Sequence, residues 1–445
     1  MQTSTIKFSQ IEDRIDAEYY KPEYLKIYNN LEKRKGVVLL EDVAKEVVSG
    51  SYIDTYFPKR TLYLRVNNLK EDGFDLSDVK YVDIQYSKVP QKIRVHTNDL
   101  VLGRTGTVGT TLIVPNELDG AVMSQHITKI VPSEKINRFY LMIYLNSRHG
   151  RLQAEKTALG SMQKELTLDA TKNIKVFIPP QSLQQKIEKI VKEAQEKRKL
   201  ADEKYKEAEE ILNKELGLED LDLSTQKTFE AKFSETEDRF DPEYYQSKYK
   251  KIISKLKTQN SKPLGEIVKI RKGIEVGHES YTTEGVPFIR VQDYNEKEIS
   301  ISGSTNFIRP YLYAELKKNH KPDTGEIIYS KDGTVGRAFV VPEDSREFIV
   351  SGGILILTPR DIDNYYLALV LNSEIVRSQA VRKSIGAIIQ HLSIDEVKKL
   401  QIPILPQSTQ QKISSLIQKS FKFRKESKEL INKAKREVEE MIEKN

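Results

Sequence analysis

The chain contains two copies of one sequence unit. The stretch KFSQIEDRIDAEYYKPEY begins at Lys7 and returns as KFSETEDRFDPEYYQSKY at Lys232, 225 residues further on. PQSLQQKI at Pro180 returns as PQSTQQKI at Pro406, and the segments between keep nearly the same spacing. A period of this length indicates a duplicated domain with its connector, rather than a solenoid of short repeats.

Composition limits the classes of protein to which the two units can belong. The chain has 445 residues, 38% hydrophobic and 31% charged, and no apolar run approaches the ~20 residues of a membrane helix. The absence of cysteine excludes disulfides and thiolate zinc sites. Since the start shows no secretory pattern, the expected location is the cytoplasm, away from any membrane. A net charge of +7 favours a nucleic-acid partner, although an ordinary basic protein also fits it.

Each unit is predicted to be a mixed α+β domain of about 180 residues. A charged and aromatic opening segment is expected to be helical. Short strands follow, separated by Gly, Pro and Asn: TLYLRV, LVLGR and TTLIVP in the first copy, and PFIRV, EIIYS and AFVVP in the second. An amphipathic helix comes next (NRFYLMIYLNS, DNYYLALVLNS), then a short helix with a capping box from Ser393 to Glu396 in the second copy. A last strand ends at proline.

A long exposed helix is expected after each domain. No glycine or proline occurs from Ser182 to Leu216, where charged residues and alanine dominate. Ser182 with Gln185 matches the capping box that begins a helix, and Ser408 with Gln411 repeats it. Gly217 is the expected stop of the first helix.

Both long helices carry the same sevenfold pattern, a row of small residues beside a row of larger ones that includes Arg198 or Arg424. Small residues let two helix backbones approach, and sevenfold spacing keeps one seam facing the partner. We therefore expect an antiparallel coiled coil, in preference to two separate surface helices. The predicted seam residues are Ile187, Val191, Ala194, Ala201, Tyr205, Ala208 and Leu212 in the first helix, and Ile413, Ile417, Ser420, Ser427, Ile431, Ala434 and Val438 in the second.

These elements predict an α+β fold with two pseudo-twofold-related globular domains separated by the two packed helices. An antiparallel pair would place one domain at each end, because the first helix has to continue into the second domain. The expected boundaries are 1–181 for the first domain, 182–222 for the spacer helix, 223–407 for the second domain and 408–445 for the C-terminal helix.

The glycine-rich stretch GRTGTVG is similar at first sight to a phosphate-binding loop. Its spacing matches neither GxGxxG nor GxxxxGK, and strands flank it, so a tight β-hairpin is expected. The second copy keeps GTVG but has Ser330 in place of the first glycine. Arg104 and Lys331 stand at equivalent places beside the turn, with Arg337 on its far side. Such cations can reach DNA phosphates or base edges, or simply face solvent.

The sequence offers no positive sign of catalysis. Its six histidines include no i, i+4 pair and no HExxH, and none recurs in both copies, so no duplicated metal site is expected. Neither a GxSxG elbow nor the Asn/Asp-Pro-Pro-aromatic motif of adenine methyltransferases is present. KPDTGEIIYSK faintly resembles a nuclease carboxylate cluster, but it lacks a Glu-x-Lys partner and is missing from the first copy.

The whole chain resembles the specificity (S) subunit of type I DNA restriction–modification systems. The most specific parts are the junctions FIPPQSLQQKI and IPILPQSTQQKI, which are similar to the family's IPxPPLxEQxxI. The Gly-turn segments LGSMQKEL and IGAIIQHL and the GTVG hairpins add to the resemblance. This chain has Gln184 and Gln410 where the family usually has a glutamate, while the glutamine at the next position remains.

The resemblance implies two target-recognition domains, each reading one half of a split target in double-stranded DNA. It also implies that the long helices set the spacing and bind two modification (methyltransferase) subunits. Those subunits would carry S-adenosylmethionine, so this chain is expected to be a non-catalytic subunit with no cofactor or metal of its own. Restriction subunits are a further expected partner. In this interpretation two copies exist because the target has two halves.

Base contacts are expected where the copies differ, because there one scaffold carries different chemistry. Those segments are SYIDTYFPKRTLY, EDGFDLSDVKYVDIQYSKVPQK and RLQAEKTALGSMQ in the first copy, and IEVGHESYTTEGVPF, EKEISISGSTNFIRPYLYAELKKNH and RSQAVRKSIGAII in the second. The residues expected at the DNA are Arg65, Arg104, Thr105, Thr107, Gln163, Lys164, Arg290, Lys331, Asp332, Thr334, Arg337 and Gln390.

Two other functions fit the same sequence. The chain could be a coiled-coil scaffold whose domains bind protein, in which case neither half would show salt-dependent DNA affinity. It could also be a standalone DNA-modifying enzyme with unfamiliar motifs, which would methylate DNA without a partner.

Overall fold

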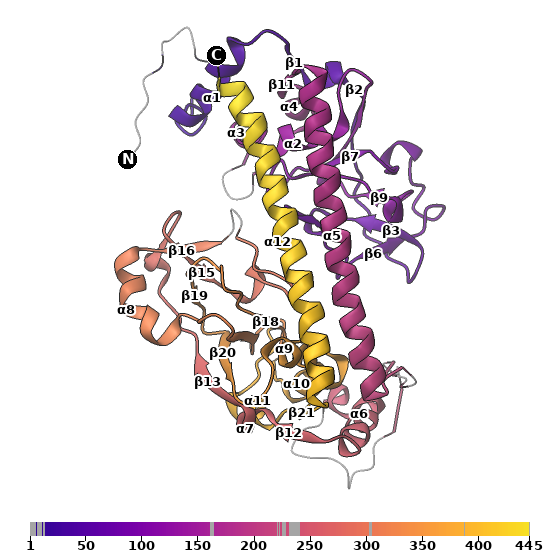
Figure 1. The fold of residues 1–445 in the computed structure, drawn as a ribbon. Helices are drawn as coiled ribbons and strands as arrows, with labels where there is room; N and C mark the ends of the chain where they lie inside the picture. The colour runs from indigo at the N-terminus through magenta and orange to yellow at the C-terminus, as the bar shows by residue number, and fades with distance from the viewer. Residues whose placement is uncertain are drawn as a thin grey trace. The chain divides into compact units, whose positions relative to one another are not determined.

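The computed structural model of the protein describes residues 6, 11, 14–160, 164–219, 221, 223–224, 228–230, 241–301, 305–386 and 388–444. Two compact units are present: unit 1 is Met1–Arg198 with Lys425–Asn445, and unit 2 is Lys199–Arg424. Both long helices therefore contribute one segment to each unit (Figure 1).

Unit 1 is built on a four-stranded antiparallel sheet with the order β2-β10-β7-β8. A second sheet has the order β6-β3-β9, and β1 pairs with β11. The strands are β1 (Val37–Leu39), β2 (Ala44–Ser49), β3 (Thr61–Leu64), β4 (Leu69–Lys70), β5 (Gly73–Phe74), β6 (Lys80–Val82), β7 (Leu100–Gly103), β8 (Thr111–Ile113), β9 (Val122–Met123), β10 (Ile127–Pro132) and β11 (Lys175–Phe177). The shorter helices are α1 (Pro22–Glu32), α2 (Arg138–Asn146), α3 (Arg148–Thr157) and α4 (Leu168–Lys172).

Unit 2 repeats this plan with the sheet β13-β20-β17-β18, the sheet β14-β16-β15-β19 and the pair β12-β21. The strands are β12 (Ser261–Pro263), β13 (Val268–Lys272), β14 (Tyr281–Thr282), β15 (Val286–Ile289), β16 (Asn306–Ile308), β17 (Ile327–Ser330), β18 (Ala338–Val340), β19 (Ile349–Val350), β20 (Ile354–Pro359) and β21 (Gln401–Pro403). The shorter helices are α6 (Ser247–Lys257), α7 (Leu264–Ile267), α8 (Pro310–His320), α9 (Asn364–Asn372), α10 (Glu374–Lys383) and α11 (Ile394–Lys399).

The main four-stranded sheets of the two units share their strand register as well as their order. Ile127 of β10 pairs with Gly103 of β7, and Ile354 of β20 pairs with Ser330 of β17, which are the equivalent residues of the second copy. In both units one strand pair is parallel, β3 with β9 and β15 with β19. The predicted duplicated α+β fold is therefore confirmed.

The helix predicted to be amphipathic is buried nearly all round, so that prediction was wrong. Residues 140–145 of α2 and 366–371 of α9 are all buried. Each helix also ties itself to the last strand of its unit: Tyr140 Oη donates to Phe177 O at 2.7 Å, and Tyr366 Oη donates to Pro403 O at 2.8 Å. The turn and side-chain cap of Ser393, which accepts a hydrogen bond from Glu396 N, occur as expected.

The long helices are α5 (Gln181–Leu216) and α12 (Gln407–Glu443). The predicted serine caps are wrong, because α5 begins before Ser182 and Gln184 N donates to Pro180 O. Gln184 holds the junction instead: its amide nitrogen donates to Pro179 O, and its amide oxygen accepts from Asn137 N. α5 stops before Gly217, which has the expected left-handed φ of 58°.

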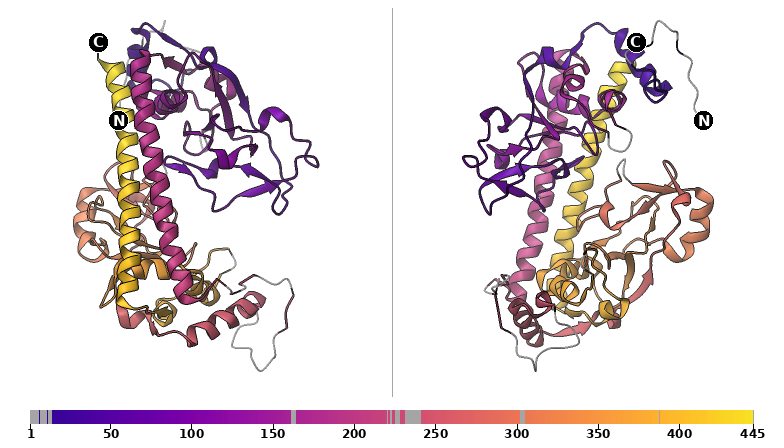
Figure 2. Two further views of the ribbon diagram at one scale, coloured as in Figure 1. Left: turned by 45° about the vertical axis from the view of Figure 1, so that its right-hand side comes forward. Right: turned by 180° about the vertical axis from the view of Figure 1, so that it is seen from behind.

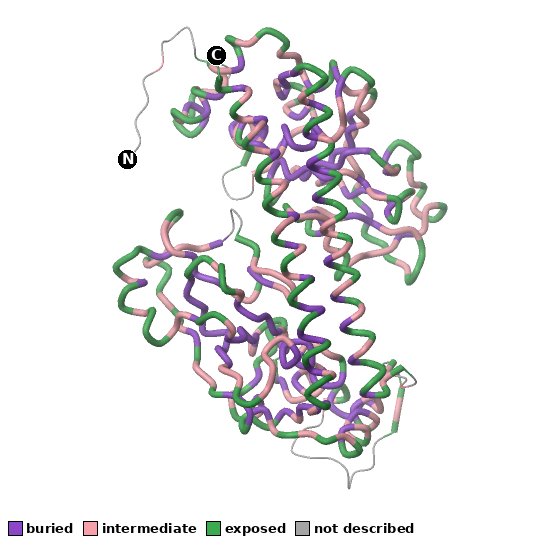
Figure 3. Tube along the Cα trace, in the orientation of Figure 1, coloured by how far each residue is buried: buried purple, intermediate pink, exposed green. Residues whose placement is uncertain are grey.

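The helices run antiparallel, as predicted. In unit 1 Lys186 pairs with Glu437 at 2.8 Å and Lys197 pairs with Glu426 at 2.6 Å, so the partner number falls as the α5 number rises. All predicted seam residues are buried except Ile431, which is partly buried against the core of unit 1. Figure 3 shows buried and exposed segments alternating along both helices. Within the described part of the chain, no helix is both long and apolar enough to cross a membrane.

Candidate nucleic-acid interface

The two glycine turns form the predicted hairpins. Gly106 and Gly109 have positive φ between β7 and β8, and Gly333 and Gly336 repeat this between β17 and β18. Each hairpin is bridged to the Gly-turn segment that precedes α4 or α11, through Thr105 with Glu165 in unit 1 and Asp332 with His391 in unit 2. The turn thus belongs to a paired loop structure.

The Arg104 guanidinium faces protein acceptors. Its Nε donates to Leu166 O at 2.7 Å, and its Nη1 donates to Ser49 Oγ at 2.5 Å and to Gln125 O at 2.9 Å. Nη2 lies 3.1 Å from Glu165 Oε1, and 13% of the side chain is exposed. This geometry favours a structural role for Arg104 over the contact with DNA that we predicted.

Lys331 occupies the equivalent place in unit 2 and is also engaged. Its ammonium lies 2.5 Å from Asp332 Oδ2, and the other oxygen of that carboxylate is 3.0 Å from His391 Nδ1. The side chain of Lys331 is 15% exposed. A carboxylate that neutralises the ammonium weakens its pull on a phosphate.

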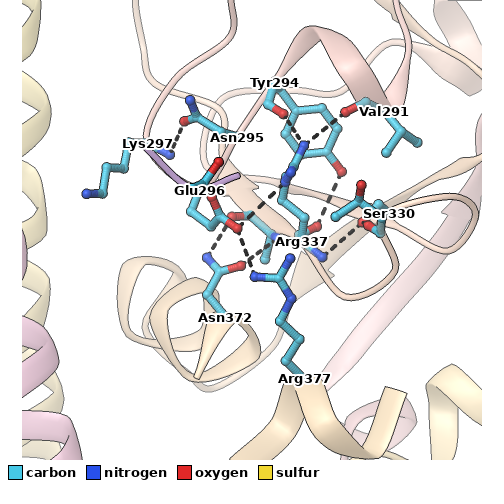
Figure 4. A network of polar contacts seen from close by, with 12 residues as sticks. Val291, Tyr294, Asn295, Glu296, Lys297, Ser330, Arg337, Asn372 and Arg377 are labelled. Carbon is cyan, nitrogen blue, oxygen red and sulfur yellow. Dashed lines mark hydrogen bonds and ion pairs between the residues drawn. The ribbon is translucent and has the colours of Figure 1, made fainter. Parts of the chain in front are cut away.

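Arg337 joins the hairpin of unit 2 to the loop after β15 (Figure 4). Its Nη1 donates to Tyr294 O at 2.7 Å and to Val291 O at 3.2 Å, while Nε lies 3.6 Å from Glu296 Oε1. Arg377 reaches the same glutamate oxygen at 3.0 Å. Arg337 therefore holds the hairpin and the loop after β15 together inside unit 2.

Arg65 and Arg290 occupy equivalent positions where β3 and β15 end. Arg65 Nη2 donates to Asp78 Oδ2 at 2.7 Å, and this hydrogen bond is the main reason that the pKa of the Asp78 carboxyl is lowered. Arg290 Nε lies 3.5 Å from Asp293 Oδ2, and burial raises the pKa of the Asp293 carboxyl. Both side chains are partly exposed, at 24% and 31%.

The other predicted DNA residues differ in their exposure. Thr107, Thr334 and Gln390 are exposed near the paired hairpins, whereas Thr105 is buried. Lys164 is partly exposed, with its ammonium 3.8 Å from Glu18. Gln163 lies outside the described residues. Their contacts with DNA stay predictions.

The segments that differ between the two copies contain a feature that the sequence analysis did not predict. This feature is a set of exposed tyrosines in unit 1. Tyr52 and Tyr86 are each 68% exposed, and Tyr56 is 46% exposed. They lie on the loop pair, which we define as residues 52–60 and 81–88. Figure 2 shows unit 1, whose N-terminal part is drawn in indigo, from two further directions.

Contacts within the loop pair hold the two segments together. Phe57 N donates to Tyr81 O at 2.8 Å, and the ring of Phe57 lies edge-on to that of Tyr86, with centroids 5.3 Å apart. The Tyr63 hydroxyl donates to Ser51 O and accepts from Ile53 N, which fixes the start of the first segment.

Lysines project from the same loop pair. Lys59 and Lys88 are exposed and have left-handed φ values of 51° and 47°, which are uncommon for residues with a side chain. Within the described chain, no carboxylate oxygen lies within 4 Å of either ammonium. The loop pair therefore offers aromatic faces beside uncompensated positive charge.

Unit 2 has helix α8 where unit 1 has the second segment of the loop pair. α8 (Figure 1) buries Tyr313, and exposes Tyr311 (62%) together with Lys317 and Lys318. An α-helix fits the major groove, about 12 Å wide, and tyrosine and lysine side chains suit base edges and phosphates. The loop pair of unit 1 and α8 of unit 2 are thus different elements on the same frame, and both expose tyrosine and lysine side chains that suit contact with DNA.

A family model of the type I restriction modification DNA specificity domain matches residues 5–210 and again 257–439. The chain belongs to this family. The two matches correspond to the two copies, and a type I specificity subunit accounts for both the duplicated frame and the long helices.

Individual relatives are distant from this specificity subunit. A protein of Haemophilus influenzae named as a candidate type I restriction enzyme specificity subunit is 27% identical over 182 residues, which are 40% of this chain and 43% of that protein. The chain thus matches less than half the length of this curated relative. The S subunit structure from M. genitalium aligns with 90% of this chain and 94% of its own, at 14% identity and a TM-score of 0.40. The HsdS subunit of Thermoanaerobacter tengcongensis aligns with 91% and 96%, at 16% identity and a TM-score of 0.29.

Proposed function

We propose that each unit of this specificity subunit reads one half of a two-part target in double-stranded DNA. The observation that carries the proposal is the exchange of exposed elements on one frame: the second segment of the loop pair in unit 1 stands where unit 2 has α8. The sheets and helices that the two units share would place each unit in the same way against the long helices. Different exposed elements would let them select different bases.

The chemistry of the two elements suits different forms of readout. In unit 1, Tyr52, Tyr56 and Tyr86 can pack on sugars and bases while Lys59 and Lys88 neutralise phosphates. In unit 2, α8 would enter the major groove with Tyr311 and Lys318 on its exposed side. Salt would weaken both contacts because phosphate neutralisation releases counterions.

The long helices are proposed to dock two modification subunits and to set the distance between the half-sites. Exposed residues along α5 and α12 leave surface for such partners. The modification subunits would bind S-adenosylmethionine and methylate adenine, and this chain would direct them without catalysis or a cofactor of its own. Restriction subunits would complete a nuclease.

Mapping of methylated adenines tests the proposal directly. The chain is expressed with a cognate modification subunit, and the methylated sites are sequenced. Tyr56→Ala with Lys59→Ala should relax one half of the target, and Tyr311→Ala with Lys318→Ala should relax the other, each losing about 1–3 kcal/mol of discrimination at affected positions.

Lys45→Ala is the matched control, because Lys45 is an exposed lysine outside both elements. An unchanged methylation pattern in both double variants would show that the loop pair and α8 do not read bases. Methylation by the chain without a partner would instead support the standalone enzyme. Binding without any salt dependence would support the protein scaffold.

A further inference from the structure

A cavity of about 240 Å³ lies in unit 2 between three of its shorter helices, α6, α10 and α11 (Figure 1). Its apolar lining consists of Tyr249, Ile252 and Ile253 from α6, with Leu400 from the end of α11. An apolar cavity of ~150 Å³ is large enough to hold benzene. This cavity therefore has room for one aromatic ring with a substituent, or for two fused rings.

In unit 1 the equivalent place holds an aromatic ring. Tyr28 of α1 stands where the second copy has Ile253. The centre of its ring lies 4.1 Å from the ammonium of Lys156 on α3, and Lys156 is the equivalent of Arg382 on α10. The same ammonium lies 4.0 Å from the centre of the Tyr19 ring, and the Lys156 side chain is buried. Unit 1 thus places two aromatic rings around one cation.

Arg382, which lines the cavity, keeps the first of these rings. Its guanidinium carbon lies 4.1 Å from the centre of the ring of Tyr244, the equivalent of Tyr19, and its Nε donates to Tyr244 O at 3.0 Å. The ring of Tyr249 lies further away, at 5.9 Å. The second ring of unit 1 is replaced by the side chain of Ile253, which also lines the cavity. Since a guanidinium plane stacks on aromatic faces, the cavity lies where an aromatic ring would complete the arrangement of unit 1.

The charged residues that line the cavity are mainly basic. Lys383 and Lys399 line it together with Arg382, and they stand where unit 1 has the uncharged Thr157 and Asn173. The side chain of Lys399 is 70% exposed, and its ammonium lies 2.8 Å from Oε1 of Glu396, the acidic residue of the lining. Because cations outnumber carboxylates in this lining, a positively charged ligand would be repelled.

We propose that this cavity binds a small planar aromatic molecule, uncharged or anionic, whose ring stacks on Arg382 as the ring of Tyr28 lies over Lys156 in unit 1. Ile252, Ile253 and Leu400 would contact the remaining surface of the ring. Binding pockets for small molecules commonly combine such an apolar lining with a few polar groups that fix the orientation of the ligand. The lining residues belong to α6, α10 and α11 and not to α8, so the inference does not depend on DNA reading.

Binding of 1-naphthoate to the full chain, without DNA, tests the inference. Calorimetry measures the affinity, and NMR of the isoleucine δ1 methyl groups locates the probe. The ring current should shift the methyl resonances of Ile252 and Ile253, whereas the methyl of Ile27, the equivalent of Ile252 in unit 1, should stay in place. The saturated analogue decahydro-1-naphthoate should bind about two- to fivefold more weakly, because it has no aromatic face for the guanidinium. The cation 1-naphthylmethylamine should also bind more weakly than 1-naphthoate.

Two variants give unit 2 the residues of unit 1. Ile253→Tyr should weaken 1-naphthoate binding by at least about tenfold, because the new ring fills the cavity. Ile253→Val keeps the cavity and should bind the probe as the native chain does. Lys399→Asn changes an exposed side chain, so the fold is kept, and it should weaken 1-naphthoate binding about two- to fivefold. Lys269→Asn removes an exposed lysine of unit 2 outside the cavity and should leave the affinity unchanged.

Three results would overturn the inference. If the methyl resonances of Ile252 and Ile253 stay in place when the probe is in excess, or if Ile253→Tyr and Ile253→Val bind it equally, the cavity is not the site. If the saturated analogue binds as tightly as 1-naphthoate, the ligand class is not aromatic. If Lys399→Asn and Lys269→Asn have the same effect, the probe responds to the overall charge of the chain and not to this cavity.

Discussion

His149 lies in the interior of unit 1, and neither of its ring nitrogens has a hydrogen-bond partner in the described structure. Burial lowers the pKa of the imidazole from 6.5 to about 4. The unfolded chain therefore binds a proton at this residue between about pH 6.5 and 4 while the folded chain does not, so stability is lost as the pH falls through that window. The equivalent residue of unit 2 is the buried Ile375.

We expect His149→Ile to remove most of this acid sensitivity, because isoleucine fills the same place in the second copy without a titrating group. The native chain should lose up to about 3 kcal/mol between pH 7 and pH 4 through this residue. Urea unfolding at several pH values measures the loss. His96→Ala, at an exposed histidine, should keep the native pH dependence. If His149→Ile lost as much stability at acid pH as the native chain, His149 would not be the source of the acid sensitivity.

Arg104 and Lys331 occupy equivalent places but make different numbers of contacts, so their removal should lower the stability of the chain by different amounts. Arg104→Ala removes the donor to two backbone carbonyls and one hydroxyl, and should lower the free energy of unfolding by about 2–4 kcal/mol. Lys331→Ala removes one ion pair and should cost about 1 kcal/mol or less. Chemical unfolding of both variants checks this. If Arg104→Ala left stability intact but weakened DNA binding, the predicted contact of Arg104 with DNA would be correct.

At the scale of elements, the seam of the long helices depends on small residues that also hydrogen-bond. Ser427 Oγ donates to Ala194 O and Ser420 Oγ donates to Ala201 O, each at 2.7 Å, and both serines are buried. The hydroxyls thus cross to the backbone of the facing helix, which a larger side chain would displace.

Ser427→Ala should cost about 1 kcal/mol, since one buried hydrogen bond is lost and the carbonyl retains its helical partner. Ser427→Val should cost more, about 1–3 kcal/mol beyond that, because the added volume forces the backbones apart. Thermal unfolding of the two variants ranks them. Equal stabilities would mean that close helix approach at this residue is unimportant.

At the scale of the whole molecule, the proposed function implies that the length of the helix pair sets the distance between the two half-sites. Ala194 faces Ser427 and Ala201 faces Ser420, so each step forward on α5 matches one step back on α12. One heptad inserted after Lys199 and another after Phe421 would preserve this register. The helices would lengthen by about 10 Å.

We expect such a paired insertion to keep both half-sequences and to widen the unread spacer by roughly three base pairs. Methylated sites mapped with the modification subunit present give the spacer directly. Insertion in α5 alone is the control, and it should abolish activity because the seam is broken. A paired variant that is active on the original spacer would show that the helices do not set the distance.

Periodic and local features of this chain were predictable from its sequence. The short strands, the glycine hairpins and the seam with its arginines follow from patterns within a few residues of one another, and the duplication follows from comparing the two halves of the chain. Hydrogen bonding along a helix and alternation along a strand are local, so such patterns carry them. The end of α5 at Gly217 is of the same kind.

The direction and engagement of individual side chains depended on residues far away in the chain. Arg104 looked like a free cation because its acceptors, at Ser49, Gln125 and Leu166, come together only in the folded unit. α2 is buried because β8 and α3 pack against a helix that the sequence predicted to be amphipathic. The ion-pair partners of Asp72 and Lys297, Arg198 and Asp202 of α5, likewise become apparent only in the folded units. Long-range packing determines which groups lose water and which keep it, and no local pattern records that.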